Sequence, residues 1–130
     1  MAGTILMVED NPTNMKLFSL MLESVGHKVL WAESGELGLP MAEQEKPDLI
    51  LMDIGLPGMD GLEATRRLKQ NPLTSAIPVI AVTAHSLGSD RDQALRAGCS
   101  DFMAKPVRMK NFLDCIQAYM PADPGSPPPP

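Results

Sequence analysis

The sequence contains no long hydrophobic run. Its apolar stretches end after about six residues, whereas a helix needs roughly 20 apolar residues to cross a bilayer. The first residues, Met1-Ala2-Gly3, lead directly into an apolar stretch and show none of the regions of a signal peptide. We therefore expect a cytoplasmic protein without a membrane span.

Cysteine and clustered positive charge are also scarce. Cys99 and Cys115 are too far apart for a CxxC motif and have no histidine beside them, so we expect free thiols rather than a metal site. The 11 Lys and Arg residues are outnumbered by 16 Asp and Glu residues, which gives a net charge of -5. Direct nucleic-acid binding is not expected, because it depends on clustered Lys and Arg that neutralise phosphates.

The length indicates one domain. A chain of 130 residues can bury a core without disulfides or metals to support it. The last ten residues are rich in proline and cannot bury much apolar surface. We expect a folded domain over residues 1–120 and a disordered proline-rich tail over residues 121–130.

The segment from Asp48 to Gly61 carries the most informative pattern. Residues 49–52 are all apolar, without alternation, which predicts a strand buried on both faces of a parallel sheet. Asp53 ends this strand, and the glycines and proline that follow predict a loop. The Asp53 carboxylate is therefore expected to be exposed at the carboxyl edge of the sheet, where open α/β sheets bind ligands.

Three other predicted strands also end in chemically useful residues. Residues 4–8 are followed by Glu9 and Asp10, residues 77–82 by Thr83, and residues 102–104 by Lys105. Residues 28–32 form a less uniformly apolar strand, which predicts a place near the sheet edge. Because the carboxyl ends of parallel strands meet at one edge, we expect three acids, a hydroxyl and an ammonium group to lie together.

Helical patterns alternate with these strands. They are expected from Asn11-Pro12 to Gly26, from Ser34 to about residue 45, and over residues 61–69, 90–97 and 109–119. In the first helix the apolar stripe consists of Met15, Phe18, Leu22 and Val25, and in the second the apolar positions are Leu37, Met41 and Ala42. Pro40 predicts a kink or a delayed start of the second helix. This alternation is typical of an α/β fold with a parallel sheet covered by helices on both faces.

Glu9-Asp10, Asp53, Thr83 and Lys105-Pro106, in this order and at strand ends, resemble the receiver domain of two-component response regulators. The resemblance covers roughly residues 3–120. Residues 8–11, 14–18 and 46–54 carry a narrower resemblance to single-domain, DivK-like regulators. The family implies a doubly wound, flavodoxin-like (CheY-like) fold of five parallel strands in the order 2-1-3-4-5.

The resemblance also implies the chemistry of the site. Asp53 would accept a phosphoryl group from a phosphohistidine of a sensor histidine kinase or a histidine phosphotransfer protein. Three converging carboxylates repel one another by about 4 kcal/mol per pair at an effective dielectric near 20, and a divalent cation relieves this repulsion. By resemblance the cation is Mg²⁺, with Asp10 and Asp53 as direct ligands, Glu9 acting through water, and the carbonyl of Gly55 as a further ligand.

The remaining family positions concern the phosphoryl group and its readout. Lys105 and Thr83 would contact the phosphoryl oxygens, Thr83 and Phe102 would form a switch, and the Lys105–Pro106 peptide bond would be cis. Phosphorylation would then alter a protein-binding face made by the fourth helix, the last strand and the fifth helix, over roughly residues 87–119. A downstream protein would recognise that face.

Other functions remain open at this point. A phosphohydrolase with an Asp nucleophile usually carries a second Asp two residues later, where this chain has Gly55, so turnover of outside substrates is not expected. We expect catalytic groups that serve only the protein's own phosphorylation and dephosphorylation. The chain could also be a receiver domain excised from a hybrid histidine kinase or larger regulator, a phosphorelay intermediate, or a pseudo-receiver that only binds partners.

Overall fold

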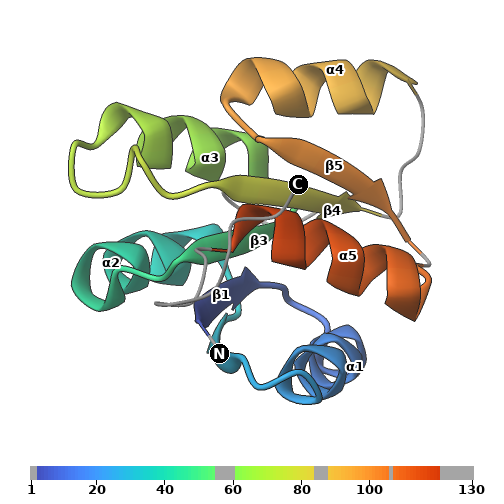
Figure 1. Ribbon diagram of the computed structural model, residues 1–130. Coiled ribbons are helices and arrows are strands. Elements are labelled where there is room, and N and C mark those ends of the chain that lie inside the picture. The colour runs from blue at the N-terminus through green and yellow to red at the C-terminus, as the bar shows by residue number, and fades with distance from the viewer. Residues whose placement is uncertain (1–2, 55–60, 84–87, 106, 121–130) are drawn as a thin grey trace.

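The computed structural model describes residues 3–54, 61–83, 88–105 and 107–120. Five parallel strands form one sheet in the order β2-β1-β3-β4-β5, with helices between them along the chain (Figure 1). The strands are β1 (Thr4–Val8), β2 (Lys28–Ala32), β3 (Leu49–Asp53), β4 (Val79–Thr83) and β5 (Asp101–Ala104). The predicted fold class, strand order and edge position of residues 28–32 are confirmed.

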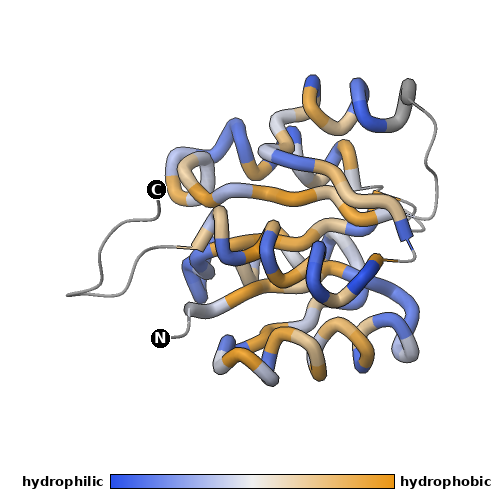
Figure 2. Tube along the Cα trace, turned by 45° about the vertical axis from the view of Figure 1, so that its right-hand side comes forward, coloured by the Kyte–Doolittle hydropathy of each residue, from blue (hydrophilic) through white to orange (hydrophobic). Residues whose placement is uncertain are grey.

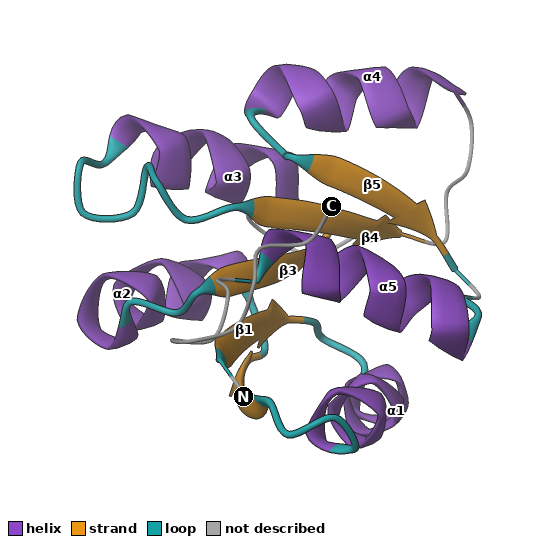
Figure 3. Ribbon diagram, in the orientation of Figure 1, coloured by secondary structure: helices purple, strands orange, loops and turns teal. Residues whose placement is uncertain are grey.

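The described residues contain five helices, of which four connect consecutive strands and the last follows β5. They are α1 (Pro12–Glu23), α2 (Gly35–Glu45), α3 (Gly61–Gln70), α4 (Gly88–Ala97) and α5 (Met109–Tyr119). Helices α1 and α5 cover one face of the sheet, and α2, α3 and α4 cover the other (Figure 3). In the described part of the chain, no helix combines the length and the apolar character that a membrane crossing requires.

Alternate residues of each strand supply two separate cores. Met7 and Leu51 pack against Phe18 of α1 and Phe112 of α5, whose ring centroids lie 5.1 Å apart. Their neighbours along the same strands point to the opposite face, toward the small residues of α2, α3 and α4. Apolar residues accordingly follow the central strands closely (Figure 2). This double burial is the reason that the strands read as unbroken apolar runs.

Helix α1 begins as predicted and ends earlier than predicted. The Asn11 side chain accepts hydrogen bonds from the backbone N–H groups of Thr13 and Asn14, at 2.9 and 3.2 Å, and Pro12 occupies the first turn. The helix ends at Glu23, and the chain then turns through Gly26, which has a φ of 91°. Val25 therefore lies outside the apolar stripe, 50% exposed, and its predicted core position was wrong.

Helix α2 corrects two predictions. It starts directly after Ser34, whose hydroxyl accepts a hydrogen bond from the N–H of Leu37 at 3.2 Å, and it continues through Pro40. Of the two predicted alternatives, the delayed start is therefore excluded, and the kink at Pro40 stays a prediction. Leu37, one of the predicted apolar positions of this helix, is 54% exposed, because α2 faces the sheet with Gly35, Gly38 and Ala42. A Cβ atom on Gly38 would lie 3.0 Å from Cγ2 of Val8, so only small residues fit there.

Candidate functional site

The site lies where β1, β3, β4 and β5 end on the same edge of the sheet. Carboxylate oxygens of Glu9, Asp10 and Asp53 lie within 4.8 Å of one another. Glu9 and Asp10 directly follow β1, and Asp53 is the last residue of β3. The register that pairs Val8 with Met52 brings these two strand ends level. The acidic cluster predicted from the sequence is therefore present.

Lys105 joins the two buried members of the cluster. Its Nζ lies 2.7 Å from Oε1 of Glu9 and 3.3 Å from Oδ2 of Asp53, and its side chain is 15% exposed. The backbone places it there, because the N–H of Lys105 donates a 2.7 Å hydrogen bond to the carbonyl of Thr83 at the end of β4. Lys105 thus forms one charged network with Asp53 and Glu9, which precede it by 52 and 96 positions in the sequence.

The three acids differ in their exposure to water. Glu9 is fully buried, Asp53 is 7% exposed, and Asp10 lies on the surface. The sequence predicted an exposed Asp53 carboxylate, but the residue is mostly buried, so the predicted exposure was too high. The side chains of Glu9 and Lys105 lie against Asp53 on one side, and the first residue of α3, Gly61, packs on its backbone.

Burial changes the acidity of this network. Loss of hydration and a hydrogen bond to Asp53 raise the pKa of Glu9 from 4.5 to about 7, although Lys105 opposes the change. Burial alone would lower the pKa of Lys105, but the hydrogen bond to Glu9 and the charge of Asp53 outweigh it, so this pKa is raised. Lys105 therefore stays protonated, and Glu9 holds a proton more readily than an exposed glutamate does.

The other predicted site residues are placed as follows. Thr83 is buried at the end of β4. Phe102 is partly buried in β5 and packs against the core under α2, α3 and α4. Gly55 and Pro106 lie outside the described residues, as does the predicted tail over residues 121–130.

Gly61 is a residue whose role the sequence did not reveal. A Cβ atom built on it would overlap the backbone carbonyl oxygen of Asp53 and would lie 2.8 Å from Cα of Ile54. Such distances essentially never occur for real Cβ atoms, and backbone atoms cannot rotate away. The sequence marked Gly61 as one of several glycines after β3 and as the start of the predicted helix over residues 61–69. No local pattern shows how closely that helix approaches the strand.

Substituting Gly61 with alanine should therefore destabilise the protein and displace Asp53. We expect the free energy of unfolding to fall by about 2 kcal/mol, the range found for overpacked sites, as measured by urea denaturation. Gly38→Ala is the matched control. There the new methyl group meets a side chain, Cγ2 of Val8 at 3.0 Å, rather than backbone atoms, and alanine is the better helix former by up to ~1 kcal/mol. Equal stability losses in the two variants would contradict this account.

The donor set of the cluster fits a hard divalent cation. Carboxylate oxygens are the ligands that Mg²⁺ and Ca²⁺ prefer, and Mg²⁺ typically takes only one or two of them. Buried Glu9 and Asp53 provide carboxyl oxygens on one side of the cluster, and Asp10 is exposed to solvent. The residues present are thus suited to holding such an ion at the edge of the sheet.

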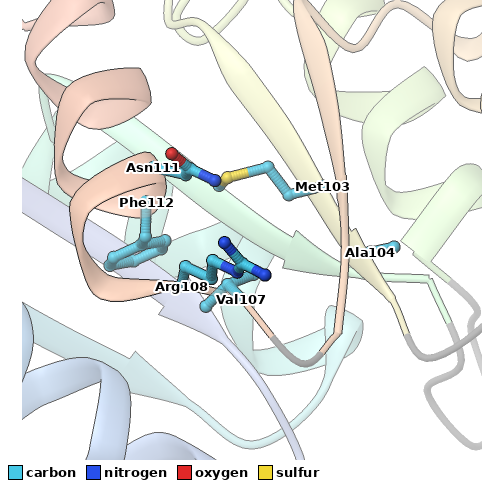
Figure 4. Close-up of a pocket in the computed structure, with 6 residues that line it drawn as sticks. All are labelled: Met103, Ala104, Val107, Arg108, Asn111 and Phe112. Carbon is cyan, nitrogen blue, oxygen red and sulfur yellow. The ribbon is translucent and has the colours of Figure 1, made fainter.

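A pocket of about 280 Å³ lies farther along the chain, between the end of β5 and the start of α5 (Figure 4). Its lining consists of Met103, Ala104, Val107, Arg108, Asn111 and Phe112. The lining contains neither a carboxylate nor a nucleophilic group. The chemistry therefore belongs to the acidic cluster and not to this pocket.

Known proteins resemble the chain along nearly its whole length. It is 47% identical over 116 residues to the protein PilH of Pseudomonas aeruginosa, covering 89% of this chain and 96% of PilH. It is 40% identical over 120 residues to the polar-differentiation response regulator DivK of Brucella ovis, covering 92% and 98% of the two chains. These relatives agree with the narrower resemblance to DivK-like regulators.

A solved structure extends the comparison to three dimensions. The receiver domain of a sensor histidine kinase from Pseudomonas aeruginosa superposes with a TM-score of 0.85 at 37% identity, covering 92% of this chain and 98% of that one. That domain has a magnesium ion coordinated in its active-site cleft. The family model of the response regulator receiver domain matches residues 5–117. With strand order, acidic cluster and sequence in agreement, the chain belongs to the response regulator receiver domain family of two-component signalling.

Proposed function

We propose that Asp53 is the phosphoacceptor of this receiver domain. The observation that carries the proposal is the placement of the Lys105 ammonium, 3.3 Å from Asp53 and 2.7 Å from Glu9, inside a cluster of three carboxylates. A surface lysine would not be held by two buried acids at the ends of different strands. The arrangement provides a carboxylate nucleophile next to a fixed positive charge, as phosphoryl transfer requires.

The donor would be a phosphohistidine of a sensor histidine kinase or of a histidine phosphotransfer protein. An oxygen of Asp53 attacks phosphorus, the P–N bond to the imidazole breaks, and an acyl phosphate forms on Asp53. Charge on the equatorial phosphoryl oxygens would be stabilised by Lys105 and by a hydrogen bond from the hydroxyl of Thr83. Both side chains lie at the ends of neighbouring strands, β5 and β4, and their backbones are hydrogen bonded.

We assign the acidic cluster to Mg²⁺, in line with the ion present in the related kinase receiver domain. Asp10 and Asp53 would be direct ligands, Glu9 would act through water, and the carbonyl of Gly55 would be a further ligand. When bound, the ion neutralises charge on the carboxylates and on the incoming phosphoryl oxygens. These groups serve the phosphorylation and dephosphorylation of the protein itself rather than turnover of outside substrates.

Output would occur through a protein partner in the cytoplasm. The phosphoryl group adds negative charge and acceptor oxygens beside Thr83, and movement of Thr83 would open space for Phe102 to rotate. This would alter the face formed by α4, β5 and α5, and a downstream protein that prefers one form would shift the equilibrium by its differential affinity. In this proposal residues 1–120 form the signalling domain and residues 121–130 a proline-rich tail.

A place within a longer relay is the second candidate. The similar solved domain is part of a sensor histidine kinase, so this chain can be a receiver domain of a hybrid kinase, or an intermediate that passes its phosphoryl group to a second histidine. Both alternatives use the same chemistry at Asp53. These alternatives differ from the first proposal in one respect. In a relay, a histidine phosphotransfer protein would remove the phosphoryl group from the phosphorylated chain.

Phosphorylation by acetyl phosphate tests the proposal directly. With Mg²⁺, intact-mass spectrometry should show one added phosphoryl group, and EDTA should prevent its addition because the acids then repel the donor. Asp53→Asn should abolish the label, because an amide is not a nucleophile. Asp114→Asn, which changes an exposed acid on α5, is the matched control and should label normally. Labelling of the Asp53→Asn variant, or undiminished labelling in EDTA, would contradict the assignment.

A further inference from the structure

Trp31 contacts the acidic cluster through the backbone. It is the sole tryptophan of the chain, lies on the edge strand β2, and is 39% exposed. Its indole Nε1–H donates a 2.7 Å hydrogen bond to the carbonyl oxygen of Glu9. An indole nitrogen can only donate, so a backbone carbonyl is a suitable partner.

Strand β2 therefore holds both backbone groups of Glu9. The N–H of Glu9 donates to the carbonyl of Ala32 at 3.0 Å, which extends the pairing of β1 and β2. The carbonyl of Glu9 is then bound by the side chain of Trp31, at the point where the regular pairing ends with Val8 and Ala32. The side chain of Glu9 is separately held by Lys105.

The hydrogen bond from Trp31 to the carbonyl of Glu9 restrains the position of Asp10. The peptide between Glu9 and Asp10 is planar, so a hydrogen bond that fixes the carbonyl of Glu9 also fixes the direction of the following N–H and Cα. Asp10 is the exposed acid of the cluster and has no burial to hold it in place. Its carboxylate is thus oriented through the backbone that Trp31 restrains.

We propose that Trp31 is a positioning residue for the cation site, acting through the Glu9–Asp10 peptide. This inference depends on the proposed function, in that the acidic cluster must bind Mg²⁺. Strand β2 contributes no acid to the cluster, and Trp31 is the side chain through which this strand influences it. The exposed ring leaves the indole N–H oriented inward and the apolar body at the surface, an arrangement suited to tryptophan.

The test compares Mg²⁺ affinities by isothermal titration calorimetry. Trp31→Phe keeps an aromatic ring and removes the N–H, and we expect it to weaken Mg²⁺ binding about threefold to tenfold, the effect of one net hydrogen bond. Tyr119→Phe is the matched control. It deletes a hydroxyl that donates to the carbonyl of Ser100 at 3.1 Å, and it should leave the affinity unchanged. If Trp31→Phe lowers thermal stability but binds Mg²⁺ within twofold of the unmodified protein, the positioning role is overturned.

Two further measurements separate this inference from the proposed function. Asp10→Asn should abolish tight Mg²⁺ binding whether or not Trp31 has a positioning role. Absence of Mg²⁺ binding in the unmodified protein would overturn both proposals. The chain has one tryptophan and so gives one indole N–H signal in a proton–nitrogen NMR spectrum. This measurement uses the unmodified protein and does not depend on whether a variant folds. We expect this signal to shift along the calorimetric binding curve during Mg²⁺ titration. A signal that stays unmoved while Mg²⁺ binds would overturn the role of Trp31 alone.

Discussion

Replacing Lys105 with methionine is expected to slow phosphorylation of Asp53 by acetyl phosphate about 10²- to 10³-fold at saturating Mg²⁺. This is the typical effect of removing one preorganised electrostatic contact to a reacting group. The Lys105 side chain is 15% exposed, and its ammonium group is held by Glu9 and Asp53 at 2.7 and 3.3 Å. It therefore needs little rearrangement to meet the incoming phosphoryl oxygens. Methionine keeps a similar length and removes the charge.

The rate measurement needs two comparison variants. Lys110→Met removes an exposed lysine from the first turn of α5 and should label at the rate of the unmodified protein. Lys105→Arg keeps the charge, but its planar fork does not fit the position of a compact ammonium, so we expect an intermediate rate. Initial rates from intact-mass spectrometry separate the three cases. A Lys105→Met variant that labels as fast as Lys110→Met would remove Lys105 from the mechanism.

Removing the ammonium should also affect the buried acids. Lys105 lowers the pKa of Glu9, against the stronger effects of burial and of Asp53. Without that contact Glu9 would take up a proton at still higher pH, because an unpaired buried carboxylate is costly. The variant can thus remain folded at neutral pH, so a lost rate would report on chemistry rather than on unfolding.

The sequence predicted where the site residues lie and not how closely they approach. Unbroken apolar runs located four of the five strands, β1, β3, β4 and β5, and the residue after each run indicated which groups reach the sheet edge. Side-chain periodicity carries that information locally. The close approach of Gly61 to Asp53 and the hydrogen bond from Trp31 to Glu9 each join two different elements of the fold. No local pattern encodes such distances.

The errors share the same cause. Leu37 and Val25 fitted apolar spacing, but one lies on a helix that approaches the sheet through glycine and alanine, and the other lies beyond the end of its helix. Asp53 was predicted to be exposed because it ends a strand. It is 7% exposed, and among the described residues Glu9, Lys105 and Gly61 lie against it. These three follow β1, follow β5 and begin α3. Burial at an element's end is set by tertiary packing, which propensity does not determine.

Glu9 should make the metal-free protein less stable at pH 8 than at pH 5. Burial and the hydrogen bond to Asp53 raise its pKa to about 7 in the folded protein, against an ordinary value of 4.5. Between these values the folded state keeps a proton that the unfolded chain has released. The contribution of Glu9 is thus fully present below pH 4.5 and is lost as the pH rises toward 7. Its size is about 3 kcal/mol.

Glu9→Gln isolates this contribution, because an amide does not titrate and resembles the protonated acid in shape. In EDTA, urea denaturation should give similar free energies of unfolding for both proteins at pH 5, with the variant up to about 3 kcal/mol more stable at pH 8. Glu33→Gln, at an exposed acid just after β2, should show no such pH-dependent difference. Saturating Mg²⁺ should reverse the order at pH 8, because the ion takes the place of the proton and stabilises the carboxylate of the unmodified protein. If the unmodified protein and Glu9→Gln keep the same difference in stability at pH 5 and pH 8, Glu9 does not hold a proton in the folded state, and the cluster does not carry the electrostatic strain that a bound cation would relieve.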